Sequence, residues 1–406
     1  MNNIFLNGPI NYVKLYNEEK NKYLYVFMDY HENIETQQKC NSLHSIDIDK
    51  YLHHILEESD INIDFFLEIY PTSINNDTDS SINHIYLRAL RDKFKKLYND
   101  LEIKKKKNIR LHYIDIRAYT LYENLSNSIN LCINNFTFIN PYNLNNLIYQ
   151  INYIYNEISY LFDMITKIKD KGKILEDKIK IDLIKREAKK INTKLPYNQI
   201  EDHATFQILE KIIIKYDDTI NKENINNLFQ TKYIDNLLYL ITFVDKFLIK
   251  LKDIQKLVNY YYNEKKIVLE NIKLDINTFH KLSYYIIPNE ENIRIEIKKE
   301  LDTIYFIIIN LGAIIVDCFF LRRFIDKSYI KNGIVYTGAA HSTIYIWFLI
   351  KFYNYKITEF NYLKNITVDK LYEVILSSDD PYDIEEYLYP ENFKQCVFLK
   401  KGLFEE

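Results

Sequence analysis

The chain has 406 residues, of which 27% are charged and 47% hydrophobic. This balance allows a buried core beneath a solvated surface, so it excludes a disordered chain and a small stapled scaffold. A formal net charge of −3 argues against a nucleic-acid partner, because binding to phosphate backbones needs a concentrated basic face. The one basic run, Lys104 to Lys107, is typical of a solvated loop.

The four cysteines are widely scattered, at Cys40, Cys132, Cys318 and Cys396. They form no C-x-x-C pair, so neither a zinc ribbon nor a dithiol redox site is indicated. We therefore expect reduced thiols in a cytosolic compartment.

The first 120 residues alternate strand-like apolar runs with helical periodicity, which predicts a sheet covered by helices. Residues 12–16 and 23–28 flank a polar stretch and predict a β-hairpin. Further strands are predicted at 61–69 and 109–116, and helices at 45–58 and 82–98.

The middle of the chain is predicted to be helical. Asn140-Pro141 is a good helix start, and apolar residues then recur with four-three spacing over 144–165 and again over 234–251. The polar stretch 167–194 between them predicts an exposed helix or a mobile arm. These features predict a large all-helical insertion at 140–289.

The α/β pattern returns after Pro288, with helices predicted at 292–325 and 342–352 and strands at 334–337 and 355–360. The sequence thus predicts an α/β fold in which a mixed sheet flanked by helices is assembled from both chain ends, 1–139 and 290–406.

One apolar run, at 303–321, is long enough to suggest a membrane span. Asn310 and Asp317 interrupt it, and Arg322 and Arg323 follow directly. Because polar groups in hydrocarbon are costly, we expect a buried helix and no membrane span. The charge of Asp317 should then be matched by Arg322, by Arg323 or by a polar pocket.

Four strand-like runs each end in polar residues that suit chemistry. These endings are Asp29-Tyr30-His31, Glu68, Asp115 with Arg117, and Gly338-Ala339-Ala340-His341. Parallel strands place their carboxyl ends at one edge of a sheet, where open α/β folds bind ligands. We therefore expect His31, Glu68, Asp115 and His341 to surround one cavity.

Imidazoles and carboxylates can share a divalent metal or divide the roles of base, acid and orienting group. Asp29, His31, Glu68 and His341 are the candidate metal ligands. The candidate catalytic residues are His31, Glu68, Asp115, Arg117 and His341, and Tyr30, Gly338 and Ser342 are candidates for substrate binding. Taken singly, each also has a structural interpretation, such as a hydrogen bond from a lone histidine or an ion pair between Asp115 and Arg117.

Asp29-Tyr30-His31, Glu68, Asp115-x-Arg117 and the late Gly338-Ala-Ala-His341, each after a predicted strand, together resemble the paired G-x-x-H signature of the erythromycin esterase, ChaN, TraB/PrgY and Tiki superfamily. The resemblance covers the two terminal α/β portions and implies both histidine motifs in one cleft. Its members include esterase-like hydrolases, haem-binding proteins and metal-dependent peptidases. Met28 stands where that superfamily has glycine. The late segment is also similar to one in uncharacterised proteins of large cytoplasmic DNA viruses with AT-rich genomes.

Two functions follow as hypotheses. The first is a hydrolase-like protein whose His/carboxylate pocket cleaves an ester or peptide bond in a small-molecule or peptide substrate, with a divalent metal as the candidate cofactor. The second is a catalytically inactive viral structural or host-interaction protein that binds a protein partner through its helical region. We expect a cytoplasmic location, in the host cytoplasm or in a virion. Met28 and the lack of an evident nucleophile favour the second hypothesis, and the polar strand endings favour the first.

Overall fold

The computed structural model describes residues 4–69, 85–99, 108–117, 120–170, 197–272 and 289–404. The basic run Lys104 to Lys107 lies outside these residues, as does 171–194 of the polar stretch.

The chain forms two compact units. The α/β unit consists of 1–116, 216–224 and 316–406, and the helical unit consists of 117–215 and 225–315. These bounds differ from the predicted 140–289 because the first helix after the N-terminal strands and most of the long apolar helix pack with the helical unit.

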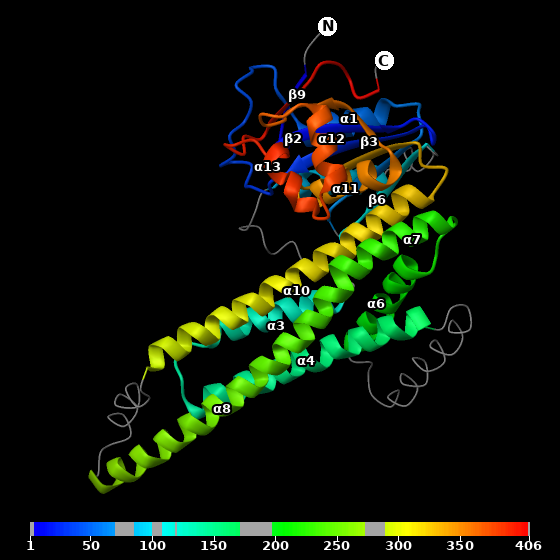
Figure 1. Ribbon diagram of the computed structural model, residues 1–406. Helices are drawn as coiled ribbons and strands as arrows, with labels where there is room; N and C mark the ends of the chain where they lie inside the picture. The colour runs from blue at the N-terminus through cyan, green and yellow to red at the C-terminus, as the bar shows by residue number, and fades with distance from the viewer. Residues whose placement is uncertain are drawn as a thin grey trace. The chain divides into compact units, whose positions relative to one another are not determined.

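The main sheet is mixed and has the strand order β6-β5-β7-β3-β2-β8. Its strands β2, β3 and β6 are labelled in Figure 1. Strands β6, β5, β7 and β3 are parallel, whereas β2 is antiparallel to both of its neighbours. The C-terminal strand β7 lies between β5 and β3, so the predicted assembly from both chain ends and the predicted hairpin are confirmed. The strands are β2 (Asn11–Asn17), β3 (Lys22–Asp29), β5 (Ile63–Leu67), β6 (Ile109–Tyr113), β7 (Asn332–Gly338) and β8 (Lys356–Phe360).

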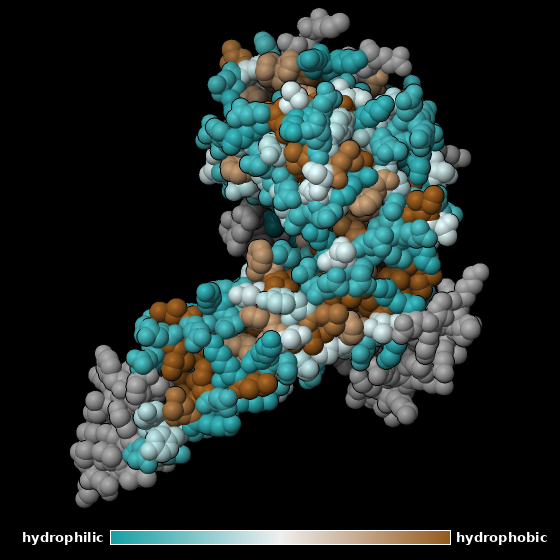
Figure 2. Space-filling model, in the orientation of Figure 1, coloured by the Kyte–Doolittle hydropathy of each residue, from teal (hydrophilic) through white to brown (hydrophobic). Residues whose placement is uncertain are grey.

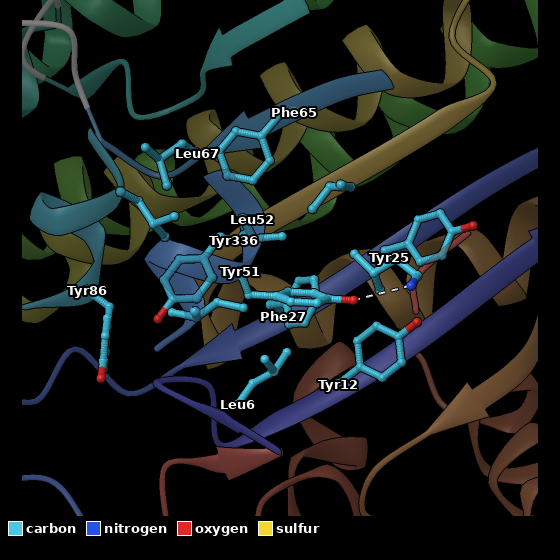
Figure 3. Close-up of a cluster of buried hydrophobic side chains, with 14 of the residues drawn as sticks. Leu6, Tyr12, Tyr25, Phe27, Tyr51, Leu52, Phe65, Leu67, Tyr86 and Tyr336 are labelled. Atoms are coloured by element: carbon cyan, nitrogen blue, oxygen red, sulfur yellow. Dashed lines mark hydrogen bonds between the residues drawn. The ribbon is translucent and has the colours of Figure 1, made fainter. Parts of the chain in front are cut away.

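Helices cover both faces of this sheet. On one face, α1 (Ile48–Glu58) and α2 (Tyr86–Asn99) contribute Tyr51, Leu52 and Tyr86 to a core shared with alternate residues of the strands (Figure 3). On the other face lie the end of α10 (Glu290–Asp326) and α11 (Ala339–Tyr353). There the ring of Phe320 is 5.0 Å from Phe66 and 4.2 Å from Tyr345. Because successive side chains of a strand point to opposite faces of the sheet, the strands contribute residues to both cores.

A smaller sheet of β1 (Ile4–Asn7), β4 (Ile46–Asp47) and β9 (Cys396–Leu399) joins the two ends of the chain. It corrects the prediction of four reduced thiols, because Cys40 and Cys396 form a disulfide across a sequence separation of 356 residues. Sequence spacing could not reveal this pair, since only the pairing of β1 with β9 brings the two cysteines together. Cys132 and Cys318 are free and buried. The C-terminal part also contains α12 (Val368–Ser377), a 3₁₀ turn at Pro381–Ile384 and α13 (Glu385–Leu388).

The helical unit confirms the large helical region. It contains α3 (Leu121–Asn135), α4 (Pro141–Asp170), α6 (Tyr197–Ile213), a π-helix at Phe229–Ile234, α8 (Asp235–Ile272) and the first part of α10, and α7 (Thr219–Leu228) ends within it. Leu144, Ile151 and Ile158 of the predicted stripe are fully buried on α4. This is the burial expected of one apolar face in a helical bundle.

Helix α10 contains the apolar run that suggested a membrane span. Among the described residues it is the one helix long and apolar enough to cross a membrane, and 61% of its most apolar window is buried in the protein. A core helix gives the same pattern, so this feature is weak evidence for a membrane.

Candidate functional site

The carboxyl ends of three parallel strands carry the site. Asp29 is the last residue of β3, Glu68 follows the last residue of β5, and Gly338 ends β7. The strand register pairs Asp29 with Gly338 and Leu67 with Tyr336. The three positions therefore lie side by side at one sheet edge, which is where such folds place ligands.

Glu68 lies at the centre of the site. Its Oε2 accepts hydrogen bonds from the backbone N–H of Gly338 at 2.6 Å and from the hydroxyl of Thr337 at 2.7 Å. Nε2 of His341 is 3.1 Å from Oε1, and Nε2 of His31 is 3.5 Å from Oε2. Four neighbouring donors thus stabilise a carboxylate that would otherwise be costly at 5% exposure.

An aspartate contacts the other ring nitrogen of each histidine. Nδ1 of His31 is 2.7 Å from Oδ2 of Asp29, and Nδ1 of His341 is 2.6 Å from Oδ1 of Asp317. We call the continuous row Asp29, His31, Glu68, His341 and Asp317 the His–carboxylate chain. An aspartate at Nδ1 orients an imidazole and fixes its tautomer, so both rings direct Nε2 toward Glu68.

Different local structures position the two histidines. His341 lies in the first turn of α11, directly after β7. His31 follows β3 in a left-handed backbone conformation, with φ at 57°. This conformation is uncommon for a residue with a Cβ atom, and such strain is concentrated at functional sites.

Gly338 is the residue that allows the close approach. A Cβ atom at this position would lie 2.9 Å from Nε2 of His31 and 3.2 Å from Oε2 of Glu68. Only glycine therefore leaves room for both side chains. Met28, at the glycine position of the early motif, is fully buried.

Charge and burial determine the protonation of the His–carboxylate chain. Burial lowers the pKa of His31, but hydrogen bonds to Asp29 and Glu68 outweigh burial and raise that pKa to about 10. Burial also opposes the charged form of His341, yet the charges of Asp317 and Glu68 hold its pKa well above the ordinary value. Although burial raises the pKa of Glu68, His341 and His31 keep it well below its usual range. At neutral pH the site thus holds two imidazolium rings, with the Glu68 carboxylate between them and an aspartate at the Nδ1 atom of each.

The predicted metal ligands Asp29, His31, Glu68 and His341 contact one another in this row. Each ring nitrogen of His31 and His341 faces a carboxylate oxygen. Within the described residues, no group of three or more His, Cys, Asp or Glu side chains could hold a metal ion. Metal binding by these histidines would require loss of the proton at Nε2, so it would compete with their contacts to Glu68.

The remaining predicted site residues are placed as follows. Tyr30 is 50% exposed and stacks on Phe393. Ser342 is buried, with its hydroxyl 3.5 Å from the carbonyl of Thr337, so it is not an exposed nucleophile. Asp115 is buried just beyond β6. Arg117 belongs to the helical unit, where it lies against Gly312.

Asp317 is a site residue that the sequence reasoning assigned only to a buried helix. Of the three partners predicted for its charge, the pocket is correct, because Asp317 pairs with His341. Arg322 instead lies over the ring of Tyr216. The available signal was a single carboxylate inside the apolar run of α10, which pointed to burial but not to a particular histidine.

Comparisons with known proteins give a family but no activity. Residues 4–402 match the model of a family described as "Family of unknown function (DUF5847)". The chain is 31% identical over 427 residues to uncharacterized protein R706 of Acanthamoeba polyphaga mimivirus, covering 97% of this chain and 95% of the relative. Uncharacterized protein R161 of the same virus is 26% identical over 445 residues, covering 97% and 96%.

No solved structure matches the chain. The mimivirus relatives support the prediction of a viral protein. They do not show the erythromycin esterase superfamily.

Proposed function

The chain belongs to the family of unknown function DUF5847, and from its site we propose a hydrolase-like protein that performs acid–base chemistry with the His–carboxylate chain. The observation that carries this proposal is one buried carboxylate, Glu68, shared by two imidazoles that each contact an aspartate. Strongly shifted pKa values in clustered groups at a sheet edge are typical of functional sites.

His31 is the member of the chain that can reach a substrate. Its side chain is 37% exposed, whereas the other four are at most 10% exposed. Asp29 orients the His31 ring, and Glu68 and His341 supply charge behind it. This division resembles other sites in which buried carboxylates support one accessible imidazole.

The protonation state favours general acid catalysis by His31. In hydrolysis of an ester or peptide bond, the imidazolium would donate its proton to the carbonyl oxygen as water adds to the carbonyl carbon. The neutral ring would then accept the proton that the water releases, which restores the imidazolium. As the C–O or C–N bond breaks, the imidazolium would protonate the departing oxygen or nitrogen, and the ring would regain its proton from the hydroxyl group that re-forms the carbonyl. Such proton transfers typically contribute about 10²- to 10⁴-fold to a rate.

The paired G-x-x-H resemblance supports the choice of reaction. It implies two histidine motifs in one cleft, and His31 and His341 both contact Glu68 here. Ester and peptide bonds are therefore the substrate classes that we propose, by analogy with that superfamily.

The test compares hydrolysis of ester and peptide test substrates by the parent, His31→Asn, His341→Asn and a control, His53→Asn. His53 pairs with Glu57 on α1 and is not part of the His–carboxylate chain. We expect a loss of about 100-fold or more in the two site variants and no loss in the control. An inactive parent, or equal activity in His31→Asn and His53→Asn, would contradict the proposal. Assays with a chelator would reveal a metal requirement.

A second candidate function is binding of a protein partner by the helical unit. Large aromatic side chains are exposed there, including Tyr142 and Tyr149 on α4 and Phe306 on α10, at 77%, 71% and 66% exposure. Figure 2 shows hydrophobic patches on the surface of the helical part. Exposed apolar patches mark interaction sites. This function suits a viral structural or host-interaction protein, in the host cytoplasm or in a virion.

A further inference from the structure

The segment that presents His31 is a long loop. Strand β3 ends at Asp29 and β4 begins at Ile46, and residues 30–45 between them contain turns but no helix or strand. A loop of this length samples many conformations unless contacts hold it, because each ordered residue costs backbone entropy.

Three contacts along this loop come from the C-terminal segment 393–396. The ring of Tyr30 stacks on Phe393 with centroids 4.5 Å apart. The backbone N–H of Gln395 donates to the carbonyl of Gln38 at 3.1 Å. The disulfide from Cys40 to Cys396 is the covalent tie in this set. His31 lies between Tyr30 and these anchors, so its position depends on them.

The disulfide differs from the free thiols in accessibility. Cys40 and Cys396 are partly exposed, whereas Cys132 and Cys318 are buried. Burial also raises the pKa of both buried thiols, so few of them are thiolates. Since exchange needs a thiolate that can reach sulfur, the partly exposed disulfide is the group that can react with small thiols.

We propose that the Cys40–Cys396 disulfide is a redox-sensitive clamp that fixes the loop presenting His31. In reduction by a low-molecular-weight thiol, one thiolate attacks a disulfide sulfur and releases the other cysteine as a thiolate. A second thiolate then resolves the mixed disulfide. The reductant leaves as its own disulfide, and the protein gains two thiols. The loop loses its covalent tie and keeps noncovalent contacts, among them the stacking of Tyr30, the hydrogen bond to Gln38 and the hydrogen bond from the Cys40 N–H to Asn7.

With this clamp, the position of His31 depends on whether the protein lies in an oxidising or a reducing compartment. Oxidising surroundings keep the disulfide closed, and a reducing cytosol opens it. The inference goes beyond the proposed function, because it concerns the loop and holds whichever reaction the site performs.

Thiol counting is the first test. Alkylation of the denatured, air-purified parent should modify two cysteines before reduction and four after reduction. Modification of all four before reduction would overturn the clamp.

Hydrogen exchange is the second test, and it follows loop amides that are hydrogen-bonded in the closed form. Thr36 and Gln37 donate to the carbonyl of Asn33, and Glu35 donates to its side chain. Reduction of the native parent should speed exchange of these amides about tenfold or more and leave the amides of β3 unchanged. Unchanged loop exchange, or equal acceleration in the loop and in β3, would overturn the proposal. The second result would show a global staple instead of a local clamp.

Matched variants separate the clamp from general effects of reductant. Cys40→Ser and Cys396→Ser should show the fast loop exchange without reductant. Cys132→Ser and Cys318→Ser should respond to reductant as the parent does. Should a serine variant fail to fold, the reductant experiment on the parent still decides. Neither test measures hydrolysis, so failure of the clamp is distinguishable from failure of the proposed function.

Discussion

A substitution at Gly338 tests the close approach of His31 and Glu68 without straining the backbone. Its φ is −54°, so the backbone accepts alanine, but the added methyl group would collide with His31 and Glu68. Gly338→Ala should therefore displace His31 and destabilise the protein by about 1–3 kcal/mol, the usual cost of overpacking. Denaturant unfolding measures the stability, and the NMR signal of the His31 ring reports its displacement.

Gly312→Ala is the matched control for this substitution. Gly312 lies inside α10, and a Cβ atom there would be 3.5 Å from Arg117 and Tyr122, an ordinary contact. Helix propensity should make this variant equal to the parent or about 1 kcal/mol more stable. A Gly338→Ala protein with parental stability and an unmoved His31 signal would show that the close approach is not needed.

The raised pKa of His31 should appear in the pH dependence of stability. Its folded pKa is about 10, against an ordinary value of 6.5. The imidazolium thus stabilises the fold fully below about pH 6.5, and this contribution is lost as the pH rises toward about 10. His31→Asn should be less stable than the parent near pH 6, by a gap that narrows toward pH 10. Urea unfolding across this range measures the gap.

The pH dependence of the parent alone does not isolate His31, because Lys22 also titrates in this pH range. Burial, together with Lys20 and Lys331, lowers its pKa to about 7 from 10.5. Stability from this residue therefore grows as the pH rises from about 7 to about 10.5, in the opposite direction to His31. The two contributions offset each other in the parent curve, whereas the difference between parent and His31→Asn isolates His31. A gap that stays constant with pH would contradict the assignment.

At the scale of elements, helix α10 contributes Asp317 to the site, where its carboxylate contacts His341. Asp317 is fully buried and contacts Nδ1 of His341, whose raised pKa depends on this charge. Asp317→Asn should lower the pKa of His341 and cost about 3–5 kcal/mol of stability, because it leaves a buried imidazolium with one anionic partner fewer. Asp302→Asn changes an exposed carboxylate on the same helix and is the control. An unchanged His341 titration in NMR would refute this role.

Elements with a strong local pattern could be predicted from sequence. The hairpin of β2 and β3 follows from alternation around a polar turn, and α4 begins at Pro141, where a helix start was expected. Of the four residues predicted to surround one cavity, His31, Glu68 and His341 contact one another, as the rule about the ends of parallel strands implies; for Asp115 and for the cavity the prediction stays open. These predictions succeed because the information is local or is fixed by sheet topology.

Pairings between distant residues could not be predicted in the same way. The bond from His341 to Asp317 depends on the rotation of α10 beneath α11, and the disulfide depends on β1 pairing with β9. Neither leaves a periodic trace in the chain. The boundary between the two units near residue 315 likewise has no local signal, because α10 continues through it without a break.

At the scale of the whole molecule, the sheet order makes the two chain ends interdependent. Strand β7 pairs with β5 on one side and with β3 on the other. Without it, β5–β6 and β2–β3 would be two separate pairs, and two-stranded sheets are marginally stable in water. The N-terminal part therefore lacks the strand that unites its own sheet.

A fragment of 1–139 should accordingly show no cooperative unfolding transition by circular dichroism in urea, and a fragment of 290–406 should fold poorly alone. Mixing the two should restore a cooperative transition, because β7 can then insert between β5 and β3. A mixture in which Phe27→Ala, at a fully buried position of β3, is carried by the N-terminal fragment should regain less stability, since truncation of a core phenylalanine costs about 3–5 kcal/mol. Cooperative unfolding of 1–139 by itself would show that the N-terminal part is an independent domain and that β7 is an addition to a sheet already formed.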